Sequence, residues 1–319
     1  MPEIEIRNEA HWHELRAKHI GASEVAALFD CQPGYALSHY ALWQVKAGRM
    51  DPPDVSGQRP EWGRRLERAI AAAAAEKEGW RIAKAGYWTH DRVAGMGCTP
   101  DFLTLGADGH PHGIVEVKNV DWLQHKRAWD GEPPLHILLQ LQAQCACVGV
   151  KRGAVIALVG GNDLAIWPYE ARPKLIAEME ARVTAFWQSI AEGKEPPIDG
   201  TESTARALAA LYPHDDGIEE AVDLGADNEL PLLCENYLLA VEIRRRGEID
   251  EREYKSGILA KLAEHHRAFC QGFIVSASEI AASPDKTITA EMVGQVIKGR
   301  AGYRRLTVKE TDDAADETA

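Results

Sequence analysis

The chain has 319 residues, 45 % of them hydrophobic, which is enough for one large domain with a sizeable core or for a domain with an appendage. Its formal net charge of −13 argues mildly against a nucleic-acid partner, although basic clusters such as Arg64–Arg68 and Arg244–Arg246 leave room for a local basic surface. No apolar run is long enough to cross a bilayer, and the N-terminal residues carry charges where a signal peptide is apolar, so we expect a cytoplasmic protein without a membrane partner.

The first half of the chain is expected to begin with helices. Residues 11–29 predict one helix, a break at Gly21 and a second helix capped by Ser23. Hydrophobic spacing and turn residues then predict further elements as far as residue 193. In chain order these are helix 36–48, Ala-rich helix 60–80, strand 81–90, strand 98–105, strand 113–120, helix 135–150, two strands within 152–171, and helix 173–193.

This order of helices and strands predicts an α/β fold in which a mixed central sheet is flanked by helices. We expect residues 1–198 to form that core. Residues 199–230 are rich in Pro, Gly and acidic side chains and are interpreted as a connecting arm. Residues 231–319 are expected to form a helical hairpin and a terminal strand that pack on the core. The six cysteines are scattered without a Cys-x-x-Cys pair, which favours buried thiols over a zinc or iron–sulfur site.

Charged residues lie in the two neighbouring strands 98–105 and 113–120, where a hairpin would bring them together. Glu116 and Lys118 are two residues apart and therefore share one face of a strand. Asp101 on the preceding strand would bring its carboxylate near that of Glu116. Two carboxylates suit Mg²⁺ or Mn²⁺, and a neighbouring Lys can orient a water molecule for phosphodiester hydrolysis. A surface hairpin with a cross-strand salt bridge is the alternative interpretation of the same residues.

Two neighbouring helices contribute further candidates. Glu67 lies on the apolar side of helix 60–80, where a carboxylate is costly unless it is paired, with Arg64 as the alternative partner, or bound to a metal. Gln140 and Gln142 lie in the otherwise apolar helix 135–150. They either bond within the core or bind a metal-bound water or the scissile phosphate.

Four motifs in order, "LR…IGAS", "WGRRLE", "TPD…IVEVK" and "LLQLQAQ", resemble the YqaJ-type viral recombinases. These are relatives of phage lambda exonuclease within the PD-(D/E)XK nuclease superfamily, and the resemblance covers about residues 10–170. It implies a PD-(D/E)XK nuclease core in which Asp101, Glu116 and the backbone carbonyl of Val117 bind Mg²⁺, with Mn²⁺ able to substitute. Lys118 would position the attacking water.

The same resemblance assigns roles to residues outside the hairpin. Glu67 would be the helix-borne carboxylate that reaches the metal or its water, and Gln140 the supporting glutamine, with Gln142 as second choice. Arg16 and Ser23 stand where the relatives bind the 5′ phosphate of a DNA end. The assignment is physically reasonable, since an Arg beside a helix N-terminus is a phosphate site. An N-cap serine and a surface arginine are the alternative interpretation.

The function implied is a Mg²⁺-dependent 5′→3′ exonuclease that acts on double-stranded DNA ends in phage-type recombination. It would produce 3′ single-stranded tails for a strand-annealing protein, and its lambda-type relatives form a ring-shaped homotrimer. Two alternatives stay open, a PD-(D/E)XK endonuclease and a non-catalytic DNA-end-binding protein. The first would lack the Arg16 and Ser23 pocket, and the second would tend to lose one of the metal-site residues.

Overall fold

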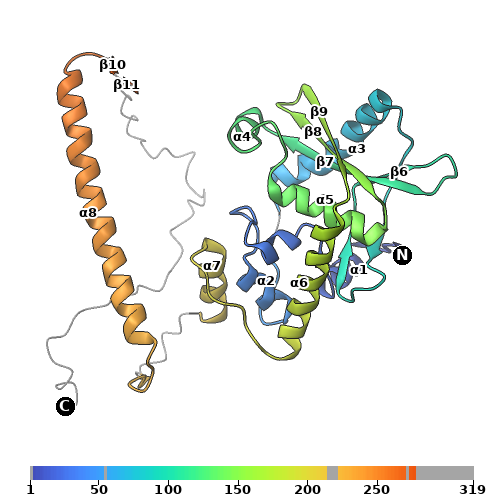
Figure 1. Ribbon diagram of the computed structural model, residues 1–319, viewed down its shortest axis with the longest axis horizontal. Helices are drawn as coiled ribbons and strands as arrows, with labels where there is room; N and C mark the ends of the chain where they lie inside the picture. The colour runs from blue at the N-terminus through green and yellow to red at the C-terminus, as the bar shows by residue number, and fades with distance from the viewer. Residues whose placement is uncertain (1–2, 54–55, 214–221, 271–272, 278–319) are drawn as a thin grey trace, which may run out of the picture. The chain divides into compact units, whose positions relative to one another are not determined.

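The structure is a computed structural model that describes residues 3–53, 56–213, 222–270 and 273–277 (Figure 1). The chain divides into two compact units, residues 1–213 and residues 214–319, and each is described by itself. The first unit contains β1 (Glu3–Ile4), α1 (Glu9–Ala17), β2 (Ile20–Gly21), the 3-10 helix η1 (Val25–Phe29), α2 (His39–Lys46), α3 (Gln58–Glu78), β3 (Ile82–Lys84), β4 (Tyr87–Thr89), β5 (Met96–Cys98), β6 (Phe102–Leu105), β7 (Pro111–Val120), α4 (Trp122–Ala128), α5 (Leu135–Val148), β8 (Arg152–Val159), β9 (Asp163–Glu170), α6 (Pro173–Ala191) and α7 (Glu202–Leu211).

A five-stranded mixed sheet in the order β3-β6-β7-β8-β9 forms the centre of the first unit. Strands β7 and β8 are parallel, and the other neighbours are antiparallel. Because side chains alternate along a strand, β7 contributes to two cores. Val115 and Val117 pack with α3, whereas Ile114 packs with α5. The predicted mixed α/β architecture is confirmed, and it leaves Glu116 on the α5 side of the sheet.

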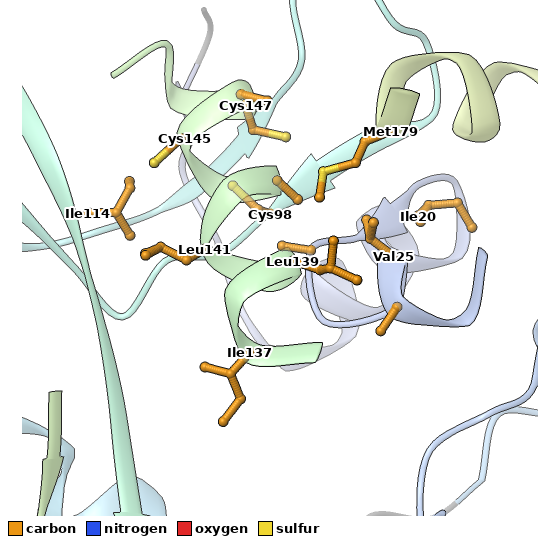
Figure 2. Packing of buried hydrophobic residues seen from close by; sticks show 14 of the residues in the cluster. Ile20, Val25, Cys98, Ile114, Ile137, Leu139, Leu141, Cys145, Cys147 and Met179 are labelled. Carbon is orange, nitrogen blue, oxygen red and sulfur yellow. The ribbon is translucent and has the colours of Figure 1, made fainter. Parts of the chain in front are cut away.

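Helix α5 lies between the sheet and the N-terminal helices. Its sequence is apolar on nearly every side, as expected for a helix with protein on both faces. Figure 2 shows Leu139 on the side of α5 that faces Val25 and Met179, and Leu141 on the side that faces Ile114. These contacts fix the rotation of α5, and therefore the direction of the polar side chains that it carries.

A second sheet, in the order β1-β4-β5-β2, lies beside the first. The single strand predicted for residues 81–90 is wrong, because the chain forms two short strands, β3 and β4, in different sheets. The break falls at Ala85 and Gly86. A Cβ atom at Gly86 would lie 2.7 Å from Oε1 of Glu3 on β1, so this exposed side chain would have to shift to admit a larger residue there.

The stretch interpreted as a connecting arm begins with a helix that belongs to the first unit. Helix α7 packs on α2 through a buried hydroxyl network at the N-terminus of α2. Ser203 Oγ accepts from the backbone N–H of Ser38 at 2.9 Å, and the hydroxyls of Ser38 and Thr204 lie 2.7 Å apart. Sequence composition missed this helix because the acidic residues around it dominate the average.

The second unit contains one long helix, α8 (Leu230–Leu262), followed by the antiparallel strands β10 (Arg267–Cys270) and β11 (Phe273–Ser276). The predicted helical hairpin is therefore wrong. Gly247, the natural turn position, continues the helix instead, because an interior glycine costs only about 1 kcal/mol relative to alanine. Ion pairs of Arg244 with Glu248 and of Arg246 with Asp250 span it. The expected terminal strand lies outside the described residues, and its packing on the core stays a prediction.

Within the described ranges, no helix combines the length and the apolar content that a bilayer span requires.

Candidate active site and adjoining pocket

The structure brings Asp101, Glu116 and Lys118 together at the centre of the main sheet. Phe102 pairs with Val115 across β6 and β7, so the antiparallel register places Asp101 next to Glu116. Oδ2 of Asp101 accepts from the backbone N–H of Val117 at 2.7 Å. Lys118 Nζ lies 2.6 Å from Oε1 of Glu116, whose side chain is only 2 % exposed. Two carboxylates and one ammonium group thus share a site with little access to water.

Two glutamines of α5 complete the surroundings of Glu116. Nε2 of Gln140 donates to Oε1 of Glu116 at 2.7 Å, and its own Oε1 accepts from Lys118 at 3.3 Å. Nε2 of Gln144 donates to the second oxygen, Oε2, at 2.7 Å. Residues four apart project from the same side of a helix, which is why both amides reach one carboxylate. Glu116 is consequently fixed by three donors.

Gln142, the second-choice glutamine, points to a different place. Its Oε1 accepts from the backbone N–H of Arg172 at 2.7 Å, and its Nε2 donates to the carbonyl of Glu170 at 3.0 Å. These bonds join α5 to the chain that enters α6. Gln142 is two positions from Gln140 along the helix, which corresponds to about 200° of rotation. The two amides therefore cannot serve one site. The sequence pointed to the wrong second glutamine, and the four-residue spacing would have selected Gln144.

The charges of the site act strongly on one another. Burial, followed by the nearby carboxylate of Glu116, raises the pKa of Asp101 well above its ordinary value, and Glu67 contributes in the same direction. Burial alone would lower the pKa of Lys118, but the carboxylates of Glu116 and Asp101 outweigh it and raise that pKa. The site therefore holds more carboxylate charge than one ammonium group can balance, a situation that favours a bound cation.

Glu67 lies on α3, across the sheet from Gln140 and Gln144. Its carboxylate is paired with Lys84 of β3, in place of the Arg64 partner considered from the sequence. The side chain is one-fifth exposed, and its charge still contributes to the raised pKa of Asp101. Glu67 thus stands near Asp101, already neutralised by a surface lysine, and its reach toward a metal stays a prediction.

The residues present fit a magnesium ion that keeps several of its waters. Among the described residues, no group of three or more His, Cys, Asp and Glu side chains converges closely enough to enclose a metal. Mg²⁺ usually needs less, because one or two carboxylates, a substrate phosphate and waters complete its octahedron. Asp101 and Glu116 supply two such carboxylates, and the contribution of the Val117 carbonyl stays a prediction. The identity of the metal stays a prediction.

A pocket of about 150 Å³ adjoins the carboxylate site. Arg16 and Ser23, the two residues predicted to bind a phosphate, both line it. So do Gln140 and Gln144, the two amides that bind Glu116. The remaining lining residues are Trp12, Gly21, Ala22, Tyr87, Cys98 and Thr99. One wall of the pocket is therefore also the wall of the carboxylate site.

Arg16 is held in the pocket by its neighbours. Its guanidinium lies 4.8 Å from the centre of the Trp12 ring, and Nη2 donates to Oε1 of Glu24 at 2.9 Å. Ser23 does not cap a helix as expected. The next helix is the five-residue η1, its N-cap residue is Glu24, and no side chain caps it. Ser23 therefore lines the pocket without capping a helix.

Residues 11–151 match the family model of the YqaJ-like viral recombinase domain. These residues include the pocket, the hairpin with Asp101 and Glu116, and all of α5. Residues 11–151 form a YqaJ-like viral recombinase domain. This confirms the resemblance drawn from the four sequence motifs. No curated protein matches the sequence.

Solved structures similar to the chain that carries this YqaJ-like domain include exonucleases. LHK-Exo in complex with dAMP is 21 % identical, with a TM-score of 0.47 over 59 % of this chain and 94 % of that one. The alkaline exonuclease LHK-Exo from Laribacter hongkongensis is 21 % identical, with a TM-score of 0.46 over 64 % of this chain and 100 % of that one. A phage-related exonuclease from Haemophilus somnus 129PT is 9 % identical, with a TM-score of 0.36 over 59 % of this chain and 89 % of that one.

In the YqaJ-like domain, Gln144→Leu is expected to lower any hydrolytic activity by about 10- to 100-fold, the typical loss if Glu116 is the predicted metal ligand and Gln144 orients it. The reason is that Oε2 of Glu116 loses its donor inside a buried site. Steady-state kinetics and thermal unfolding of the purified variant measure the effect. Gln142→Leu is the matched control, because it removes a buried amide of the same helix without touching Glu116. Equal activity losses in the two variants would contradict the assignment of Gln144.

Proposed function

We propose that this protein is a Mg²⁺-dependent 5′→3′ exonuclease that digests one strand from double-stranded DNA ends. The observation that carries this proposal is the shared wall between the two sites. Gln140 and Gln144 bind Glu116 and also line the pocket of Arg16 and Ser23. A terminal phosphate held by Arg16 would thus lie beside the carboxylates that act on the adjoining phosphodiester.

The geometry of the site supports hydrolysis of a phosphodiester. When bound, a divalent cation would polarise the scissile phosphate and make a water molecule more acidic. Asp101, Glu116 and the carbonyl of Val117 would hold that cation. Lys118 Nζ is fixed between Glu116 and Gln140, with its third N–H free to hold the attacking water and its charge able to offset the charge that builds on the phosphate. Preorganised donors of this kind need no rearrangement at the moment of reaction.

The pocket also separates this proposal from its alternatives. An endonuclease of the same superfamily has no use for a terminal-phosphate site, whereas Arg16 and Ser23 line a pocket beside the carboxylates to which we assign that role. A non-catalytic DNA-end-binding protein has no use for Lys118 held between a carboxylate and an amide. The clustering of Asp101, Glu116, Lys118 and Gln140 favours an enzyme. A strand-annealing partner and a homotrimer belong to the same proposal as predictions.

Linear and closed circular duplexes distinguish the three functions. With Mg²⁺ we expect progressive loss of a 5′ label from linear duplex. At each duplex end, the complementary strand that carries the 3′ end should be retained. The closed circle should not be attacked. EDTA is expected to stop the reaction and Mn²⁺ to restore it. Gel electrophoresis of the end-labelled products is the measurement. Cleavage of the circle would identify an endonuclease, and binding of linear ends without hydrolysis in either metal would identify an end-binding protein.

A further inference from the structure

We propose that Lys46 is a positioning residue that gives the Arg16 and Ser23 pocket its net positive charge, and with it the preference for a phosphorylated DNA end. This inference deepens the proposed function and rests on it. Lys46 is the last residue of α2, it is thirty residues from Arg16 in the sequence, and it is absent from the lining of the pocket. It would act on DNA only through its neighbours.

The ammonium group of Lys46 is buried and fully engaged. Its side chain is only 3 % exposed. Nζ lies 2.9 Å from Oε2 of Glu24 and donates to the carbonyls of Arg16 at 2.7 Å and His19 at 2.8 Å. An ammonium group has three N–H donors, so these three contacts satisfy it completely. A lysine in such a place is expensive to bury, which calls for a reason beyond stability alone.

Glu24 is the link between Lys46 and the pocket. Oε1 of Glu24 binds Nη2 of Arg16 at 2.9 Å, and Oε2 accepts from the backbone N–H of Gly21 at 2.8 Å. Burial alone would raise the pKa of Glu24, but the charges of Lys46 and Arg16 outweigh it and lower that pKa, so the group is ionised at neutral pH. One carboxylate therefore stands between two cations.

This arrangement decides how much charge Arg16 offers to a ligand. Arg16 and Glu24 alone would form a neutral pair, with little attraction left for a phosphate. Lys46 supplies the second cation, so the trio keeps one net positive charge. Arg16 is the member that lines the pocket, and that charge is directed there. Lys46 also holds the carbonyls of Arg16 and His19, which fixes the chain between α1 and β2.

Charge and structure make different predictions for a set of three variants. Lys46→Met leaves the trio neutral, Glu24→Gln raises it to two positive charges, and the double variant Lys46→Met/Glu24→Gln returns it to one. If charge decides, the ratio of kcat/KM for 5′-phosphate over 5′-hydroxyl ends falls about tenfold in Lys46→Met and rises or is kept in Glu24→Gln. The double variant then recovers most of the wild-type ratio, although it lacks more native contacts than either single variant.

The measurement is digestion of 5′-phosphorylated and 5′-hydroxyl linear duplexes by the full-length protein, with the change expected mainly in KM. Arg49→Met is the matched control, since it removes a cation paired with Glu195 close to the end of α2 and should keep the ratio. The inference is overturned if Lys46→Met keeps the wild-type ratio, or if the ratio of the double variant is as low as that of Lys46→Met. Either result leaves the proposed exonuclease function standing.

Three further outcomes are informative. If Lys46→Met does not fold, a ratio in Glu24→Gln below that of wild type overturns the inference, whereas a higher or equal ratio supports it. Wild-type protein that digests both ends at the same rate overturns the inference together with the phosphate pocket, while its digestion of linear duplex still supports the exonuclease. Wild-type protein without nuclease activity overturns the proposed function itself.

Discussion

Asp101→Asn and Glu116→Gln are each expected to lower DNA hydrolysis by roughly 10³-fold or more, the effect of losing several kcal/mol of charge stabilisation in the transition state. Both changes remove a negative charge from the oxygen set proposed to hold the metal, while the side chains keep their size. In Asp101→Asn the amide oxygen still accepts from the N–H of Val117, so the hairpin keeps its hydrogen bond. Mg²⁺-dependent digestion of linear duplex measures the loss.

The folded state of these variants has to be shown separately. Thermal unfolding should change little in Asp101→Asn and modestly in Glu116→Gln, where one of the amides of Gln140 and Gln144 loses its acceptor. Asp108→Asn, in the exposed turn between β6 and β7, is a matched control that changes the same type of side chain away from the site. Rates near that of wild type in either site variant would remove that residue from the active site.

Arg16→Ala is expected to erase most of the preference for 5′-phosphorylated ends, a change of about tenfold to a hundredfold. Each charge-assisted hydrogen bond to the phosphate is worth roughly 1.5–3 kcal/mol. The lower end of that range is expected here, because Arg16 already shares its guanidinium with Glu24. The rate on 5′-hydroxyl ends should fall far less, since those ends present no terminal phosphate to the pocket.

Competition between the two ends in one reaction measures this preference directly. Arg65→Ala is a matched control, because Arg65 is also a partly exposed arginine paired with a glutamate, Glu61, and does not line the pocket. An unchanged preference in Arg16→Ala would place the end-binding function elsewhere and would leave Asp101 and Glu116 untouched as the proposed catalytic residues.

Local sequence rules worked where local physics decides the outcome. The Ala-rich helix α3 ends at Gly79, whose φ of 67° is readily adopted by glycine. The two strands predicted within residues 152–171 form the hairpin of β8 and β9, which turns at Gly160 and Gly161. The same rules failed for α8, where nothing local forces the helix to turn at Gly247, and for residues 81–90, which are divided between two sheets by a neighbouring strand.

The sequence by itself determined the class of fold, the YqaJ-like domain, and the proximity of Asp101, Glu116 and Lys118. These depend on alternation along strands and on motif order, both of which are written in neighbouring residues. Tertiary structure alone decided that Gln144 and not Gln142 binds Glu116, because the rotation of α5 is set by packing on both of its faces. It also decided that Lys46 reaches Glu24, since buried charges find partners through space, at separations that no local pattern records.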